Sequence, residues 1–392
     1  MCALLPLWLS AQPKAYYYAQ LSERATATVA EALRQAPGVK LHYRLDWHRG
    51  AVIVADSTAA AALSQTAGIG SVEWIGSVQG RPALRLPHRR WDDADAPLPH
   101  RHAAGALHTV QARLALPDDH GPAGPPVRIA VLDGGFYGYD RHPYLHGIAD
   151  RLLGTYDFVD ADSSVAELSA HGTKVLALLA GAADHRYRAA AAGARYLLLR
   201  TEDVYQENPV ELYHFMAALE AAAAHNVQLV HASLGYYLEA TPANDRHRGR
   251  LARSLERALA ANMLIVTSGG NRKNHPVGIP ADHPGVLAVG ALDLRNRPAV
   301  FSSRSGSKPE LGAPGVRVPV VSTYGTGLHL ATGSSYGAPL VTALAARLWA
   351  ARPGTDAATL KRALLESRAA TVPGDAIFGL PSFERALRLL GR

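Results

Sequence analysis

Apolar residues recur at two different periods along this chain of 392 residues, and they predict alternating strands and helices. Three apolar runs have the length and composition of buried strands, and they are Val127–Leu132, Leu229–Ala232 and Met263–Thr267. After Ser335, apolar residues repeat at helical spacing. Pro339 is tolerated only in a first turn or at a kink, so this helix begins near Ser335.

The first 80 residues follow a compact pattern of their own. The order of the predicted elements is β-α-β-β-α-β, which is a ferredoxin-like arrangement of an α+β domain. These elements are a strand near Ala15–Ala19, a helix over Arg24–Gln35, a strand pair within Leu41–Ala55, a helix from Ser57 to about Ala67, and a strand around Ser71–Ile75.

A stretch rich in Pro, Arg, Asp and His follows, from Pro82 to about Pro126, and it predicts a linker. We place a small domain at residues 14–80, the linker at residues 81–110 and a larger domain at residues 111–392. Residues Pro353–Arg392 are expected to be terminal helices of the larger domain, with no sorting domain after them.

Ser335 lies where a glycine turn enters a helix, in the sequence Gly-Ser-Ser-Tyr-Gly-Ala-Pro. There its hydroxyl would lie beside backbone N–H groups without intrahelical partners, at the positive end of the helix dipole. Such a position suits a nucleophile whose oxyanion needs stabilising. An ordinary helix N-cap is the alternative.

A serine nucleophile needs a histidine as base and a carboxylate to orient the histidine. Asp133 ends an apolar strand, at the edge where ligands of open α/β sheets collect, although an Asp-Gly turn is the alternative. His171 precedes an apolar helix, and alone it would more often be a capping or core histidine.

The motifs around Asp133, His171 and Ser335, in this order, resemble those of the subtilisin-like serine proteases, the subtilases. The resemblance implies an α/β fold, with a parallel sheet flanked by helices, and a serine endopeptidase in which Asp133 orients, His171 is the base and Ser335 attacks. It also matches Asn271 to the oxyanion hole, together with the Ser335 N–H. A turn residue is the alternative for Asn271.

Substrate-binding positions carry over from the same resemblance. Ser233, Leu234 and Gly235 would line the cleft and pair with an extended peptide, as suits polypeptide substrates. A second set, Thr267, Ser268 and Gly269, would form a wall of the pocket for P1, the residue whose carbonyl is attacked. The alternative for both sets is a role in core strands only.

The N-terminal domain resembles the propeptide of subtilases, which assists folding and inhibits the enzyme. The chain would then be a zymogen whose own propeptide is a partner, with a processing site in the linker. A permanent accessory domain is the alternative. The run Leu199–Asp203, with Glu207 and Glu211, resembles a Bacteroidetes-type bacterial subgroup.

Several residues depart from the family pattern. Gly134 stands where Ser or Thr is frequent, and Tyr336 and Gly337 replace a methionine and an alanine beside the nucleophile. Arg272 and Lys273 follow Asn271, and we hypothesise that their charge disfavours basic P1 residues and tolerates acidic ones. These departures motivate an alternative, a catalytically impaired subtilase that binds peptides or partners. A sedolisin-type peptidase, with a glutamate base, is a third hypothesis that His171 disfavours.

Composition narrows the choice of partners. The formal charge of +7 comes from scattered arginines without a basic stripe, which does not indicate nucleic-acid binding. Among the 18 histidines only His142 and His146 have helical ligand spacing, and Pro143 argues against a helix there, so we expect no catalytic metal and no required cofactor. Asp157, Asp160 and Asp162 form an acidic loop that suits structural calcium, but a solvated loop is the favoured alternative.

The first residues, 1–13, contain a short apolar run that ends in small residues and resembles the end of a secretion signal, although the basic n-region is missing. The run is too short for a membrane span, and a strand is the alternative. The single cysteine, Cys2, excludes a disulfide within the chain. We therefore expect a secreted or cell-envelope protein without an integral membrane segment.

Overall fold

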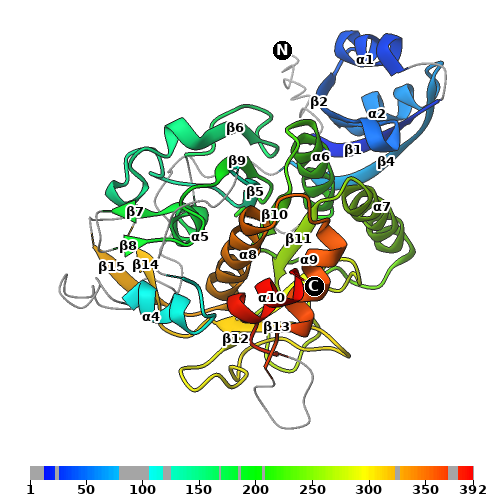
Figure 1. Cartoon of the computed structure of the whole chain (residues 1–392). Coiled ribbons are helices and arrows are strands. Elements are labelled where there is room, and N and C mark those ends of the chain that lie inside the picture. The colour runs from blue at the N-terminus through cyan, green and yellow to red at the C-terminus, as the bar shows by residue number, and fades with distance from the viewer. Residues whose placement is uncertain are drawn as a thin grey trace, which may run out of the picture. The chain divides into compact units, whose positions relative to one another are not determined.

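The structure is a computed structural model, and it describes residues 13–22, 26–78, 106–117, 125–166, 169–183, 187–204, 208–322, 327–369 and 378–391. The chain forms two compact units (Figure 1). The smaller comprises the chain up to residue 83 together with Asn208–Tyr213, and the larger comprises the remainder. Almost all of the predicted signal segment, and most of the predicted linker with its processing site, lie outside the described residues.

A four-stranded antiparallel sheet in the order β2-β3-β1-β4 forms the N-terminal unit. Its elements are β1 (Ala15–Leu21), α1 (Thr26–Gln35), β2 (Val39–Leu45), the short helix η1 (Asp46–His48), β3 (Gly50–Ala55), α2 (Ser57–Leu63) and β4 (Ile69–Ser77). This order confirms the predicted β-α-β-β-α-β arrangement.

Both helices of this unit contribute to one small core. Leu33 of α1 and Leu63 of α2 belong to the same buried cluster as Ile53 of β3. The Asp56 side chain caps α2 by accepting a 2.8 Å hydrogen bond from the Ala59 N–H. The helix ends earlier than predicted, because the chain turns after Leu63.

A seven-stranded parallel sheet in the order β13-β12-β11-β10-β5-β9-β6 forms the centre of the C-terminal unit. Its strands are β5 (Arg128–Asp133), β6 (Leu152–Asp157), β9 (Arg195–Arg200), β10 (Leu229–Ala232), β11 (Leu264–Ser268), β12 (Leu287–Leu292) and β13 (Leu311–Pro314). Two small antiparallel pairs accompany it, β7 (Ala182–Ala183) with β8 (Tyr187–Arg188) and β14 (Val318–Val321) with β15 (Leu328–Ala331).

Helices cover both faces of this sheet, with α5 and α8 on one side and α6 and α7 on the other (Figure 1). The predicted α/β architecture, a parallel sheet flanked by helices, is confirmed. The helices are α4 (Ala106–Ala112), α5 (His171–Ala180), α6 (Val210–Ala224), α7 (Pro242–Ala260), α8 (Ser334–Ala351), α9 (Ala357–Glu366) and α10 (Phe383–Leu389), with the short helices η3 (Pro143–Leu145) and η4 (Ala149–Arg151).

Helix α4 begins inside the range expected to be linker. Its residues Leu107 and Val110 are buried in the main core of the C-terminal unit, so this unit starts before residue 111. The helical spacing of these two apolar residues is the signal that could have revealed it. Among the described residues, no helix has the length and apolar character needed to cross a bilayer.

The apolar runs of the central strands are explained by burial on both faces. In β5, Ile129 and Val131 pack into the core shared with α5 and α8, and the alternate residues Ala130 and Leu132 are equally inaccessible to solvent. A strand buried on both sides has no polar face, which is why the sequence is apolar throughout rather than alternating.

The strand register places three predicted site residues in one row. Leu132 of β5 pairs with Ala232 of β10, which pairs with Thr267 of β11. The residues that follow, Asp133, Ser233 and Ser268, therefore lie side by side at the carboxyl edge of the sheet.

Candidate active site

Asp133 is a buried carboxylate whose oxygens are both engaged. Its side chain is 2% exposed, and Oδ1 accepts a 2.8 Å hydrogen bond from the N–H of Gly134. His171 Nδ1 lies 2.9 Å from Oδ2 and 3.0 Å from Oδ1. Because an ionised carboxylate only accepts, Nδ1 carries the proton, and Nε2 of the neutral ring is left as the acceptor that a base requires.

A glycine beside His171 makes this contact possible. Gly172 follows His171 in the first turn of α5, and its N–H donates to the carbonyl of Gly135 at 3.1 Å. A Cβ atom on Gly172 would lie 2.4 Å from that carbonyl oxygen. Only a glycine therefore lets the start of α5 approach the loop that follows Asp133.

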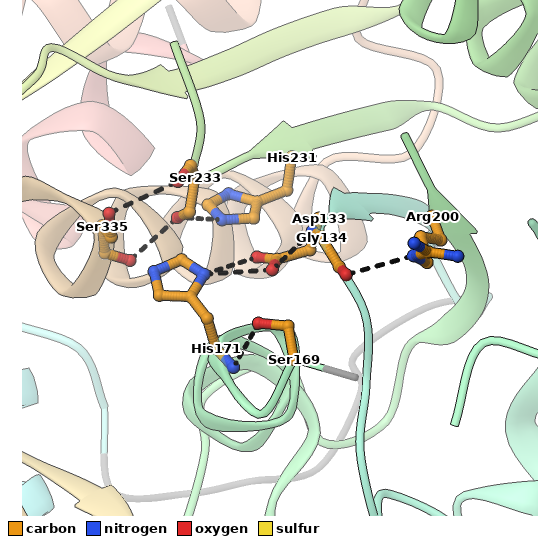
Figure 2. A network of polar contacts seen from close by, with 8 residues as sticks. All are labelled: Asp133, Gly134, Ser169, His171, Arg200, His231, Ser233 and Ser335. Carbon is orange, nitrogen blue, oxygen red and sulfur yellow. Dashed lines mark hydrogen bonds and ion pairs between the residues drawn. The ribbon is translucent and has the colours of Figure 1, made fainter. Parts of the chain in front are cut away.

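Ser335 occupies the second position of α8, as the helical spacing predicts. In Figure 2 one nitrogen of the His171 ring is joined to the Asp133 carboxylate and the other lies on the side of Ser335, and both contacts drawn from Ser335 lead to Ser233. In this structure the Ser335 hydroxyl donates to the Ser233 carbonyl at 3.3 Å. The three residues, which are far apart in sequence, are thus brought together at one edge of the sheet.

A second histidine, which the sequence analysis missed, lies behind the serine. His231 is fully buried in β10, and its Nε2 lies 2.9 Å from the Ser233 hydroxyl (Figure 2). That hydroxyl donates to the Ser335 carbonyl at 2.8 Å, so its bond to His231 must be one that it accepts from Nε2–H. Nδ1 lies 2.8 Å from the Thr342 hydroxyl, which also lies 3.2 Å from the Ala338 carbonyl.

Its environment keeps this histidine uncharged. Burial, together with the nearby His171, lowers the pKa of His231 to about 3. A neutral His231 therefore links β10, through Ser233, to the first turn of α8. A histidine inside the otherwise apolar run Leu229–Ala232 is the sequence signal that could have found it.

Asn271 follows β11 and is exposed. Its Oδ1 accepts 2.8 Å and 2.9 Å hydrogen bonds from the backbone N–H and the hydroxyl of Ser334. Because a backbone N–H can only donate, the oxygen of the amide must face Ser334 and the amide nitrogen must face away from it. This orientation leaves the amide nitrogen of Asn271 able to donate to another group.

The predicted substrate-binding residues lie at the ends of β10 and β11, but their side chains differ in accessibility. Ser233 and Leu234 are each 5% exposed, as is Ser268, and Gly269 is buried, whereas Gly235 is partly exposed. Thr267 is 0% exposed inside β11, so its side chain does not reach a cleft. Any contribution of Thr267 to a pocket wall would therefore come from its backbone.

Tyr336 is buried beside His171. Its ring is 1% exposed and its centroid lies 5.8 Å from that of His171. Gly337 brings α8 against β13, since a Cβ there would lie 3.2 Å from the Ala313 carbonyl. At position 134, a Cβ would lie 3.0 Å from the Val204 side chain, so a larger residue there would pack tightly against Val204.

The acidic loop after β6 is bound by an arginine. Arg200, at the end of β9 and 0% exposed, pairs with Asp157 and Asp160, and its Nε donates to the Gly134 carbonyl at 3.3 Å. The favoured prediction of a solvated loop is therefore wrong for Asp157, which is 3% exposed. The guanidinium supplies the positive charge that a calcium ion would bring.

The two histidines considered as metal ligands are not arranged for that role. His142 caps a short 3₁₀ turn, with Nδ1 accepting from the Tyr144 N–H at 3.2 Å and Nε2 2.8 Å from the Ser322 carbonyl. Among the described residues, no group of three or more His, Cys, Asp or Glu side chains is placed to hold a metal ion.

Comparisons with known proteins agree with this architecture. The model of the subtilase family, Peptidase S8, matches residues 124–380. The thermophilic serine proteinase of Bacillus sp. (strain AK1) is 30% identical over 220 residues, which are 56% of this chain and 51% of that protein. Subtilisin DY of Bacillus licheniformis is 26% identical over 274 residues, 68% of this chain and 92% of that protein.

Two solved structures share the fold. The MycP3 protease from the type VII (ESX-3) secretion system aligns with a TM-score of 0.61 at 22% identity, over 72% of this chain and 89% of that one. The prenylagaramide maturation protease PagA aligns with a TM-score of 0.57 at 23% identity, over 72% and 98%. The alignment with the thermophilic proteinase spans only about half of that relative's length. Because the family match runs from before Asp133 to beyond Ser335, the chain belongs to the subtilase family.

Proposed function

We propose that this protein is a serine endopeptidase in which Asp133, His171 and Ser335 form the catalytic triad. The observation that carries the proposal is the 2.9 Å contact between His171 Nδ1 and Asp133 Oδ2, with the second ring nitrogen on the side of Ser335 (Figure 2). The ring would take the proton of Ser335 as the hydroxyl attacks the scissile carbonyl, and the buried carboxylate would stabilise the imidazolium that forms.

The tetrahedral oxyanion would be held by the Asn271 amide and the Ser335 backbone N–H. The bonds from Ser334 to Asn271 Oδ1 support this role, because they fix the amide with its donors turned the other way. Loss of one oxyanion donor typically lowers turnover by about 100- to 1000-fold. Polypeptides are the proposed substrates, bound as an extended strand along Ser233, Leu234 and Gly235.

Three finer parts of the proposal follow the resemblance to the family. The N-terminal unit acts as a propeptide, with processing in residues 81–110, and the protein is secreted or resides in the cell envelope. The relationship to a Bacteroidetes-type subgroup likewise stays a prediction. No cofactor is proposed for catalysis.

The test compares wild type with Ser335→Ala. We expect a fluorophosphonate probe to label the wild type alone, and casein hydrolysis near neutral or alkaline pH to fall at least about 1000-fold in the variant. The exposed Ser164 provides a matched control, since Ser164→Ala removes a hydroxyl without touching the site. Absence of labelling would instead favour a peptide-binding role, and activity confined to acid pH a sedolisin-type mechanism.

A further inference from the structure

A tyrosine, Tyr237, lies against the backbone of Gly270, which follows β11. Tyr236, just before it, pairs with Ile279 through hydrogen bonds of 2.8 Å and 3.0 Å, so the chain that leaves Gly235 runs beside residues 278–279. Gly235 itself faces this segment, because a Cβ on it would lie 3.7 Å from the Ile279 carbonyl and 4.0 Å from Gly278 Cα. Two glycines, 270 and 278, have the Tyr237 ring as a close neighbour.

The ring of Tyr237 fills the room that these glycines leave. A Cβ on Gly270, whose φ is +98°, would lie 2.4 Å from the Tyr237 hydroxyl oxygen. A Cβ on Gly278 would lie 3.1 Å from Cζ of the same ring. The ring is therefore in close contact with the backbone immediately before Asn271.

Arg272 holds the ring from another side. Its guanidinium carbon lies 3.8 Å from the centre of the Tyr237 ring, a cation–π contact. The backbone of Arg272 is fixed by Ser303, whose hydroxyl accepts from its N–H at 3.0 Å and donates to its carbonyl at 3.2 Å. Tyr237, which is half-buried, is thus enclosed by glycine backbone and a cation.

The position of the ring bears on the residue that would be cleaved. If Asn271 binds the oxyanion formed at the P1 carbonyl, the P1 side chain, one bond from the α-carbon beside that carbonyl, must project next to the Gly270–Asn271 backbone. Tyr237 already occupies that neighbourhood. A long P1 side chain would have to displace the ring from Arg272, and a basic one would also meet the charge of Arg272.

We propose that Tyr237, clamped by Arg272, is a specificity-determining residue that shortens the P1 pocket, so that the enzyme cleaves after small uncharged residues such as Gly, Ala and Ser. This inference rests on the proposed function. The hypothesis from sequence was that the charge of Arg272 and Lys273 selects the P1 residue. The present proposal is that the volume of the P1 side chain is selected, because the ring takes up space that acidic and aromatic P1 residues would also need.

The test uses peptide p-nitroanilides that differ only at P1, with Ala, Leu or Phe. We expect the wild type to prefer Ala over Phe by at least about 10-fold in kcat/KM, since even one methylene in a pocket changes discrimination by roughly 10- to 200-fold. Tyr237→Ala is expected to raise kcat/KM for the Phe substrate at least about 10-fold while changing that for Ala less than about 3-fold.

Three further variants test whether the ring itself sets the selectivity. Tyr237→Phe keeps the aromatic volume and should keep the selectivity, whereas Arg272→Gln should relax it in part. Tyr156→Ala, which removes a half-buried tyrosine from β6, should leave the ratio of kcat/KM for the Ala and Phe substrates unchanged. An Ala to Phe ratio that is the same in Tyr237→Ala as in the wild type overturns the proposal.

A binding measurement separates this proposal from the proposed activity. In the Ser335→Ala background, calorimetric titration with peptides that end in Ala or in Phe reports the pocket without turnover. We expect tighter binding of the Ala-ending peptide and a shift of at least about 10-fold in the ratio of Kd values when Tyr237→Ala is added. An unshifted ratio contradicts the role of Tyr237, whereas failure of the wild type to react with fluorophosphonate contradicts the peptidase itself.

Discussion

At the scale of single residues, the candidate site is supported by a buried histidine, His231, that is not a member of the proposed triad. His231 donates to Ser233, and Ser233 donates to the carbonyl of Ser335. This chain of hydrogen bonds fixes the first turn of α8 against the residues that follow β10. A charged His231 could still donate from Nε2, but its charge would be buried and it would repel a protonated His171. The low pKa of His231 therefore keeps a second positive charge away from His171, the proposed base.

The low pKa of His231 predicts that the protein becomes less stable as the pH falls. The pKa of His231 is about 3 in the folded protein against 6.5 as a reference, so below pH 6.5 the unfolded chain binds a proton that the native protein does not, and the free energy of unfolding falls as the pH falls. At pH 5 the loss is about 2 kcal/mol. In the Ser335→Ala background, which prevents self-digestion, His231→Asn should shrink the difference between urea unfolding at pH 7 and pH 5 by about that amount.

The exposed His146 supplies the control for this measurement. His146→Asn should leave the difference between pH 7 and pH 5 as it is in the parent protein. An equal acid sensitivity in His231→Asn and in the parent would show that His231 is not the group responsible.

The sequence reveals residues that lie in recognisable motifs more readily than the residues that contact them from other parts of the fold. Asp133, His171 and Ser335 were predicted because each lies at an element boundary within a recognisable local pattern. The roles of His231 and Tyr237 depend on which strand or loop lies opposite them, and no local pattern encodes that. Arg200 was noticed within a charged run, but its partner Asp157 ends a strand that is distant in sequence, so the ion pair could not be predicted.

At the scale of secondary structure elements, close backbone approach sets the site's geometry. The start of α5 meets the loop after β5 only because Gly172 has no side chain. We expect Gly172→Ala to lower the free energy of unfolding by about 1–3 kcal/mol, since the added methyl would have to displace the backbone of Gly135. Because displacement of the His171 ring by about 1 Å can cost about 100-fold, kcat/KM should fall by that order.

Gly327 offers a matched control for this substitution, because a Cβ there would meet nothing within 4 Å. Gly327→Ala should change neither the unfolding transition nor kcat/KM. A Gly172→Ala protein with wild-type stability and activity would mean that the loop after β5 yields easily and that the close approach does not position His171.

The elements themselves were largely predictable, but their arrangement was not. The apolar runs located β5, β10 and β11, because strands buried on both faces leave a continuous hydrophobic signature. The register that aligns Asp133, Ser233 and Ser268 depends on pairing between distant strands. Helix α4 was assigned to a linker because the proline-rich sequence before it outweighed its two buried apolar residues.

At the scale of the whole molecule, the chain joins two units that each have a core and a sheet of their own. The small unit has a complete ferredoxin-like sheet, with Leu33, Ile53 and Leu63 buried together, and the large unit carries every residue of the proposed triad. A unit with its own core can survive separation from its neighbour as a folded fragment. This is the physical requirement for a propeptide that is released by cleavage.

The proposed zymogen predicts a cut between the two units that depends on Ser335. The purified wild type should convert from a 41.7 kDa chain into two fragments whose new terminus lies within residues 81–110, where the Pro-rich and polar sequence predicts a linker. Ser335→Ala should remain intact, and intact-mass spectrometry with N-terminal sequencing distinguishes the two.

A rate independent of protein concentration would indicate cleavage within one molecule, and Ser164→Ala should be processed like the wild type. Cleavage of Ser335→Ala at the same bond, with no active protein added, would assign the cut to a host protease and remove the support for self-processing.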